Sequence, residues 1–564
     1  MDPFDQGSAF CHLRSFSSLP SPSEARTITE IIKTIQHDEK LLQNYSSIVS
    51  SLRRIPPELW SRIFLLVYDA SPHTFQDIFR SMHPNLQLTS ICPFFRAVAL
   101  ETPQLWSTLI IDLHYIALHD SYLEQTVYLL SLFLERSGTY PLYIRLTSKS
   151  SKLSYKTTQV STYERTVQSI LSLLFTHGSH WADVRITVEN RYITESLLSR
   201  IRGNLPMLHS LDLTVPESSG TINRWTLSTD AFLSTPSLWS LTLPQCPSSL
   251  KDQFPLGQIT QLTIARFCPY DSHFYNEILP RMSSLTALVL GYRYTFADGS
   301  VRPGLCSPQL VSLTIYIDEY NNNSTKYLFP PVSLPRLKEL KILSRRHCGF
   351  SYKLPLYPCA RWDQEEFLGF WRRSSLAEGE VYLGSSLCEG EGLEFRLTRL
   401  ELANIMLRPG PEGELDMIGL LRVLPSLQYV KLLCGVASGK KKCVGTKTFF
   451  EYLLYDPLSY QEDGVMVPGL KELEVALDSE MGIGVVEDGD GVVFANTTAT
   501  AEGERGGGEE VVGAGEEVLM QFIRKRNTTL ERLELFAREI VFSDPFWEFL
   551  SGINANGERV VVNS

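Results

Sequence analysis

The sequence predicts an α/β protein in which strand–helix repeats stack into a curved parallel sheet behind a small all-helical segment. Two observations carry this prediction. The motif Pro-x-Leu-x-x-Leu-x-Leu, or a close variant, recurs between residues 205 and 535. Segments with the helical spacing of apolar residues lie between several of its copies. Strand and helix alternating at a period of about 20 to 50 residues are typical of a solenoid.

Length and composition agree with an extended repeat array. The chain has 564 residues, of which 43% are hydrophobic and 20% charged. A single core stops growing at about 250–300 residues, so the length favours several domains or one elongated array. The composition excludes a wholly disordered chain, a collagen and a small disulfide scaffold.

The spacing of the repeat can be measured between the middle apolar residues of successive motif copies. Successive copies are separated by 21 to 30 residues in most cases, and by 43 or 60 residues in three. The short spacings lie in or near the range of about 20–29 residues of leucine-rich repeats, and the long ones hold insertions. Alternate leucines of each strand are expected to face a shared core. The tracked residues are Leu211, Leu241, Leu262, Leu288, Leu313, Leu340, Leu400, Val430, Leu473 and Leu533.

The segments between the motifs supply the remaining layers. Two early segments, 140–147 and 180–190, are expected to be the first strands. Helical spacing predicts an outer layer at 193–201, 274–282, 416–424, 448–456 and 516–526. The repeat domain is predicted to span 114–564, with an aromatic-rich insertion at 345–394 and a disordered loop at 482–517. That loop holds ten glycines and nine acidic residues.

The N-terminal part is predicted to be helical and incompletely buried. Residues 1–24 are polar and Ser-rich, which indicates a disordered tail. Residues 25–54 have the pattern of an amphipathic helix or a coiled coil. In the block at 52–113, the Pro56-Pro57 pair begins one helix, and Pro103 ends a second. Two such short helices present more apolar surface than they can bury alone.

This block resembles the F-box found in many fungal proteins. The resemblance rests on IPPELWSRIF at 55–64 and LQLTSICPFFRAVALETPQLWSTL at 86–109. The second stretch matches the family's Val-Cys-x-x-Trp-Arg-x-x-Ala core, with Phe95 at the usual Trp position, and its Thr-Pro-x-Leu-Trp. The connection from Asp69 to Asn85 is longer than is typical of the family.

The resemblance implies a function. In F-box proteins the block docks on a Skp-type adaptor that joins a cullin scaffold, and the repeats recruit a protein substrate for ubiquitination. The chain would be a non-catalytic receptor subunit. The residues implied in contacting the adaptor or holding the block are Pro56, Pro57, Leu59, Ile63, Phe64, Leu88, Cys92 and Phe95.

The residues between the repeat leucines are candidates for the substrate-binding face, because side chains that alternate with core leucines point outward. Their mixed charges indicate no ligand class. The candidates are His209, Asp212, Trp239, Thr242, Lys338, Lys341, Arg399 and Glu401.

Several function classes are disfavoured. The net charge of −11 argues against a general nucleic-acid binder. None of the ten cysteines forms a Cys-x-x-Cys pair, and no common zinc, hydrolase or dinucleotide motif occurs, so no metal, cofactor or catalytic residue is expected. Without a signal peptide or a membrane-spanning apolar stretch, a cytoplasmic or nuclear location is expected. Two alternatives stay open: a repeat scaffold outside ubiquitination with the helical block as its cap, and an enzyme whose site is assembled from distant residues.

Overall fold

The computed structural model describes the chain in two compact units, residues Met1–Pro255 (unit 1) and Leu256–Ser564 (unit 2), which we treat separately. The described residues are 20–34, 54–69, 74, 83–113, 120–148, 157–214, 230–247, 249–268, 271–292, 307, 309–317, 329, 333–344, 360–375, 396–407, 411–436, 442–443, 446–454, 467–477, 485–488, 491–494, 514–526, 529–536, 540, 542–555 and 559–563. Most of the predicted tail at 1–24 and the second half of the predicted helix at 25–54 lie outside them.

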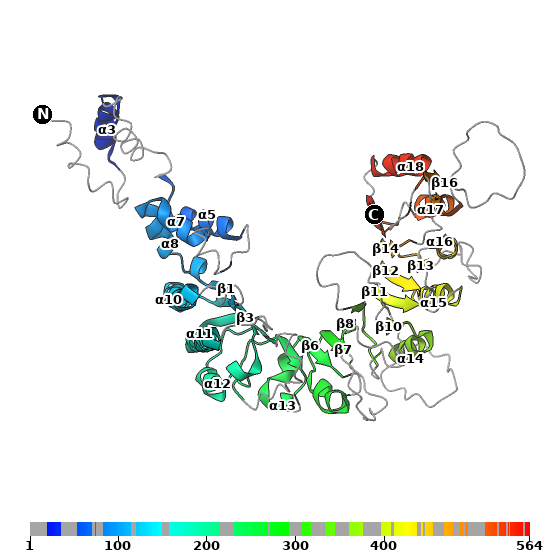
Figure 1. Ribbon diagram of the computed structural model, residues 1–564, viewed down its shortest axis with the longest axis horizontal. Coiled ribbons are helices and arrows are strands. Elements are labelled where there is room, and N and C mark those ends of the chain that lie inside the picture. The colour runs from blue at the N-terminus through cyan, green and yellow to red at the C-terminus, as the bar shows by residue number, and fades with distance from the viewer. Residues whose placement is uncertain are drawn as a thin grey trace, which may run out of the picture. The chain divides into compact units, whose positions relative to one another are not determined.

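Unit 1 begins with helices and continues with parallel strands (Figure 1). Its longer helices are α3 (Pro22–Thr34), α5 (Pro57–Asp69), α7 (Pro84–Ile91), α8 (Pro93–Leu100), α10 (Asp120–Ser137), α11 (Thr157–Thr176), α12 (Glu195–Ile201) and α13 (Leu250–Gln253). Short 3-10 turns are η2 (Pro103–Trp106), η3 (Gly178–His180) and η4 (Asn190–Tyr192). The strands are β1 (Thr108–Asp112), β2 (Leu142–Thr147), β3 (Trp181–Thr187), β4 (Ser210–Thr214) and β5 (Ser240–Gln245).

The five strands of unit 1 pair in chain order and all run parallel. Helices α10, α11 and α12 lie side by side along one face of these strands (Figure 1). The strands predicted at 140–147 and 180–190 are confirmed as β2 and β3. Strand β1 lies within the range of the predicted helical block, so the sheet begins before residue 114.

Unit 2 continues the same strand–helix pattern. Its strands are β6 (Gln261–Phe267), β7 (Ala287–Tyr292), β8 (Ser312–Ile317), β9 (Glu339–Ser344), β10 (Ala360–Arg361), β11 (Arg399–Leu407), β12 (Tyr429–Val436), β13 (Lys442–Cys443), β14 (Glu472–Ala476), β15 (Val485–Asp488), β16 (Gly491–Phe494), β17 (Arg532–Phe536) and β18 (Arg559–Asn563). Its helices are η5 (Leu256–Gln258), η6 (Phe274–Ile278, a π-helix), η7 (Leu279–Arg281), α14 (Gln364–Ser375), α15 (Pro411–Arg422), α16 (Lys447–Leu454), α17 (Ala514–Arg526) and α18 (Asp544–Ala555).

The tracked apolar residues of the repeat lie in register. Nine parallel strands of unit 2 follow chain order among its described residues: β6, β7, β8, β9, β11, β12, β14, β17 and β18. Within this series Leu262, Leu288, Leu313, Leu340, Leu400, Val430, Leu473 and Leu533 are successive partners. In unit 1 Leu211 likewise pairs with Leu241. The predicted α/β class, with parallel strands and helices between them, is therefore confirmed.

Burial and backbone hydrogen bonds explain why each motif forms one strand. Both leucines that flank an outward residue are buried, as Leu340 and Ile342 are in β9. Ahead of most strands from β4 to β14, one carbonyl accepts two amides of the next repeat: the Lys338 oxygen accepts the amides of Thr398 and Arg399 at 2.9 Å each. Each fully buried aliphatic side chain contributes about 1.5–3 kcal/mol, so the aligned leucines supply much of the driving force.

The long gaps between motif copies contain structure that the spacing does not reveal. The predicted insertion at 345–394 contains α14, whose Phe367 and Phe370 are buried together with Trp362. In the range 482–517, predicted to be a disordered loop, the described residues form the antiparallel β15–β16 hairpin and the start of α17. The strand β18 was not predicted. The predicted helices are present, although 274–282 forms a π-helical turn followed by a 3-10 turn.

Candidate functional site

Helices α5, α7 and α8 form a compact block around an aromatic core. On α5, Trp60, Phe64 and Tyr68 recur every four residues and are buried. Phe95 of α8 packs between two of them, with ring centroids 4.5 Å from Trp60 and 5.1 Å from Phe64. The half-buried Phe95 ring therefore packs against the buried stripe of α5.

Hydrogen bonds fix the ends of the block. The Cys92 sulfur accepts the Phe95 amide at 3.4 Å and so caps the start of α8. The Arg96 guanidinium donates to the Thr89 carbonyl of α7 at 2.8 Å. The Thr102 hydroxyl lies 3.0 Å from that of Ser61 on α5. These contacts hold the three helices in one arrangement.

The structure divides the eight predicted adaptor-contact residues by burial. Pro56, Pro57, Leu59 and Ile63 are exposed, Cys92 and Phe95 are half-buried, and Phe64 and Leu88 are buried. Phe64 is only 1% exposed, so it supports the fold of the block and is out of reach of a partner. The prolines precede or begin α5, where a missing amide costs no helical hydrogen bond.

An exposed apolar face remains on α5. Leu59 is 48% exposed, Ile63 37%, Leu66 71% and Val67 50%. Their spacing of i, i+4, i+7 and i+8 places them in one stripe along the helix. We call these four residues the α5 face. Leu66 and Val67 were missed by the sequence reasoning, although the same periodicity could have found them.

The block is joined to the sheet of unit 1 through Trp106. This residue follows α8 in η2 and is fully buried. Its indole nitrogen donates to the Ala99 carbonyl at 2.8 Å, and its ring packs edge-on against Phe133 of α10 at 4.9 Å. The Arg136 guanidinium lies over the same ring at 4.5 Å. The helical block and the first strand–helix pair therefore share a core.

The predicted substrate-face residues occupy outward positions on the strands, or directly ahead of them, in both units. In unit 1, Asp212 of β4 is the register partner of Thr242 on β5. His209 and Trp239 precede these strands and stack with centroids 6.3 Å apart. Trp239 is exposed despite its size.

In unit 2 the charged outward side chains compensate one another. Lys341 of β9 pairs in register with Glu401 of β11 and lies 4.0 Å from Glu339. The Arg399 guanidinium lies 3.6 Å from the centre of the Tyr429 ring. The remaining candidate, Lys338, is exposed.

The same compensation continues on the following strands of unit 2. The Lys431 ammonium lies 2.6 Å from Glu474, whose other oxygen accepts the Tyr429 hydroxyl at 2.7 Å. Arg532 pairs with Glu534 at 2.6 Å. Such pairs neutralise several charges of this strand surface, although Nε of Arg399 is buried without a hydrogen-bond partner.

Asp212 of unit 1 is in an unfavourable electrostatic environment. Burial raises the pKa of its carboxyl from 3.8 to about 6, although Arg185 and Arg145 act to lower it. Asp183 nearby raises it further. Oxygen Oδ1 of Asp212 is buried without a hydrogen-bond partner. Because the charged form of this side chain is penalised in the folded protein, Asp212 destabilises unit 1 at neutral pH.

We expect Asp212→Asn to stabilise unit 1 by about 2 kcal/mol at neutral pH. A pKa shift corresponds to about 1.4 kcal/mol per unit, and the resulting energy is reduced here because solvent screens a partly exposed carboxyl group. The folded-state pKa of about 6 lies above the ordinary 3.8. The carboxylate penalty is therefore absent below pH 3.8, grows between 3.8 and 6, and is complete above 6. Hydrogen exchange of β3 and β4, compared between wild type and variant at about pH 4 and about pH 7.5, measures this difference. Equal protection at the higher pH would contradict the prediction.

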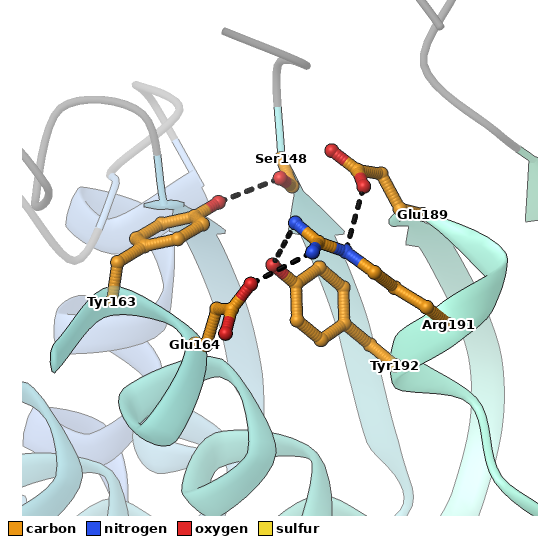
Figure 2. Close-up of polar contacts among 6 residues, drawn as sticks. All are labelled: Ser148, Tyr163, Glu164, Glu189, Arg191 and Tyr192. Atoms are coloured by element: carbon orange, nitrogen blue, oxygen red, sulfur yellow. Dashed lines mark hydrogen bonds and ion pairs between the residues drawn. The ribbon is translucent and has the colours of Figure 1, made fainter. Parts of the chain in front are cut away.

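A separate polar network lies at the carboxyl ends of β2 and β3 (Figure 2). The Arg191 guanidinium binds Glu164 of α11 at 2.7 Å and Glu189 at 2.9 Å, and it donates to the Tyr192 hydroxyl at 2.9 Å. Beside it, the Ser148 and Tyr163 hydroxyls lie 2.7 Å apart.

The electrostatics of this network indicate a structural role. Desolvation lowers the pKa of Arg191, but Tyr192, Glu189 and Glu164 together raise it above its ordinary value. Burial raises the pKa of Tyr192 to about 12, against the effect of Arg191. An arginine bound to two carboxylates, beside a tyrosine that stays protonated, offers no acid, base or free cation. The network ties η4 to α11.

The described residues contain no cluster of three or more His, Cys, Asp or Glu side chains arranged to hold a metal ion. None of the helices in the described ranges is both long and apolar enough to cross a membrane. In comparisons with protein-family models and with curated proteins, nothing matches this chain.

Proposed function

We propose that the protein is the substrate-recognition subunit of a Skp–cullin–F-box ubiquitin ligase. In this proposal the helical block binds a Skp-type adaptor, and the repeats bind a protein substrate in the cytoplasm or nucleus. The protein would act without catalysis, by holding the substrate close to the transfer machinery and raising its effective concentration.

The α5 face carries the proposal. A helix whose buried stripe already fills a block core has no internal use for a second apolar stripe of four residues. Large exposed apolar patches mark protein interfaces. The sequence resemblance of the same helix to the F-box supports a Skp-type adaptor as the partner, and the repeat sheet that follows supplies a surface for a substrate.

The proposal predicts that Leu59→Asp/Ile63→Asp abolishes co-purification with a Skp-type adaptor. Charges placed on an apolar contact must be desolvated, and we expect a loss of affinity of at least about 100-fold. Both side chains are exposed, so the thermal stability of the protein should not fall. Co-expression of the chain with the adaptor, followed by affinity purification, measures the binding.

Glu58→Lys is the matched control. Glu58 is also exposed on α5 and lies neither three nor four residues from any member of the apolar stripe, so this variant should bind the adaptor as the wild type does. A folded wild-type protein that does not bind, or a double variant that binds normally, would refute the proposal.

A second candidate function has its own observation. The Tyr68 hydroxyl donates to the Thr108 carbonyl of β1 at 3.4 Å, and Trp106 packs against α10. A helical block packed on the first strand has the position of a solenoid cap, so the chain could be an interaction scaffold outside ubiquitination. Soluble, monomeric wild-type protein without adaptor affinity would favour this alternative.

A further inference from the structure

Two arginines lie next to each other on the outward strand face of unit 1. The register aligns Arg145 of β2 with Arg185 of β3, and Arg185 with Asp212 of β4. The neighbours of both arginines along their strands are buried, so the guanidinium groups are on the side away from the core. Both residues are exposed. Like charges directly opposite each other on a sheet are destabilising.

These arginines are less compensated than Arg191 of the same unit, although both act electrostatically on Asp212. Arg145 makes no hydrogen bond or ion pair with the described residues, and Arg185 has one long contact, 3.6 Å from its Nε to Asp183. By contrast, two carboxylates hold Arg191 at 2.7 and 2.9 Å (Figure 2). In unit 2, pairs such as Lys431 with Glu474 satisfy the outward charges. The unit 1 strand face therefore keeps cationic groups available.

Exposed aromatic side chains lie on the same sheet, Tyr143 beside the arginines on β2 and Trp239 directly ahead of β5, two strands from Arg185. Tyr143 lies two residues before Arg145 on the same strand, and it is 43% exposed. Trp239 is 41% exposed and stacks on His209. Exposed Tyr, Trp and Arg are the residue types enriched at protein interfaces, where they contribute most of the binding energy.

We infer that this arginine face, made of Tyr143, Arg145, Arg185, Asp212 and Trp239, docks an acidic peptide segment of a protein partner. Arg145 and Arg185 would share one or two carboxylates of the peptide, and the two aromatic side chains would contact its neighbouring residues. This deepens the proposed function, since it names the class of partner that the repeats recruit.

Charge complementarity favours a peptide over a nucleic acid. Among the described residues of this face two adjacent arginines are available, and Asp183 and Asp212 lie beside them. A polyphosphate backbone, with a charge at every nucleotide on both sides of the arginine pair, would be repelled by these carboxylates. An isolated acidic side chain can meet both guanidinium groups and avoid the carboxylates.

Asp212 destabilises the fold at neutral pH, and in this proposal it also affects binding. It lies beside Arg185 and partly neutralises the arginine pair, so it weakens the attraction for an anion. Stability lost at one position in this way is characteristic of functional surfaces. Removing its charge should strengthen binding of an acidic peptide, whereas removing the arginines should weaken it. A surface with a merely structural role would give neither effect.

The test uses the full-length protein and a fluorescein-labelled Gly/Ser peptide with two adjacent glutamates at its centre, with binding followed by anisotropy at about pH 7.5. We expect Arg145→Gln/Arg185→Gln to raise the Kd at least about tenfold, and Asp212→Asn to lower it about threefold. Arg200→Gln is the matched control, since Arg200 is exposed on α12, in the helical layer of unit 1. Its Kd should equal that of the wild type.

Four results would overturn the inference. They are no binding of the peptide to folded wild-type protein, equal binding of the same peptide with both glutamates replaced by glutamine, an unchanged Kd in the double arginine variant, and displacement of the peptide by lower concentrations of an oligouridylate. Thermal melting of each variant shows that the fold is intact. The assay contains no adaptor, so its failure leaves the adaptor proposal standing, and failure of adaptor binding leaves this inference standing.

Discussion

Leu400→Ala is expected to destabilise unit 2 by about 3–5 kcal/mol, at the upper end for a buried leucine. Leu400 is fully buried near the start of β11, between Leu340 of β9 and Val430 of β12. Truncation removes the transfer free energy of the side chain and leaves a cavity that parallel strands on both sides cannot easily close. Urea unfolding, with hydrogen exchange of β9, β11 and β12 to assign the transition to unit 2, measures the loss.

Glu401→Ala is the matched control on the next residue of the same strand. Its side chain points to the outward face and makes no hydrogen bond or ion pair with the described residues, so the expected change is within about 0.5 kcal/mol. Similar losses in the two variants would mean that β11 is paired in a different register, because a shift of one residue exchanges the two faces.

The alternation tested by these variants is the part of the fold that the sequence predicts best. The Leu-x-x-Leu-x-Leu motif fixes which side chains face the core, and stacking the motifs on one another aligns Leu340, Leu400 and Val430. No long-range knowledge is needed for this step, because each repeat pairs with its sequence neighbour. The strand series and the positions of five helices follow from the same local pattern.

Structure between widely spaced motif copies was not predictable in the same way. The gap of 60 residues ahead of Leu400 hides α14, whose Phe367 and Phe370 are buried but lie in a segment with no recognisable motif. Strand β18 has a run of three valines without the leading Leu-x-x-Leu. A short apolar run alone does not distinguish a strand from a helix or a turn.

The α5 face and the arginine face could not be predicted from the sequence, because they depend on side-chain burial and on strand register. On α5 almost every turn carries apolar residues, so periodicity finds two stripes but does not say which one faces the core. Ile63 and Phe64 are consecutive, yet Ile63 is exposed and Phe64 is buried. Arg145 and Arg185 are adjacent only because β2 and β3 pair in one register across a connection of more than thirty residues. Side-chain burial and strand register both arise from tertiary packing.

Trp106→Ala is expected to destabilise the helical block and the start of the sheet by about 3–5 kcal/mol, because a fully buried tryptophan leaves a large cavity. The substitution also removes the indole hydrogen bond to the Ala99 carbonyl and the contacts with Phe133 and Arg136. Because these contacts join α8 to α10, hydrogen exchange should rise in both helices together. Exchange that rises in α8 alone would show that the block and the sheet do not share a core.

Two further variants separate folding from docking. Trp106→Phe keeps most of the buried volume and loses the indole hydrogen bond, so we expect a loss of about 1–2 kcal/mol. Trp547→Ala, on a half-exposed tryptophan of α18, should cost less than about 1 kcal/mol of folding stability.

If the helical block binds an adaptor, Trp106→Ala should reduce that binding by unfolding the block. Leu59→Asp/Ile63→Asp should abolish binding with no loss of stability. If Trp106→Ala loses both stability and adaptor binding, and Leu59→Asp/Ile63→Asp loses adaptor binding alone, then the adaptor contacts the α5 face of the folded block.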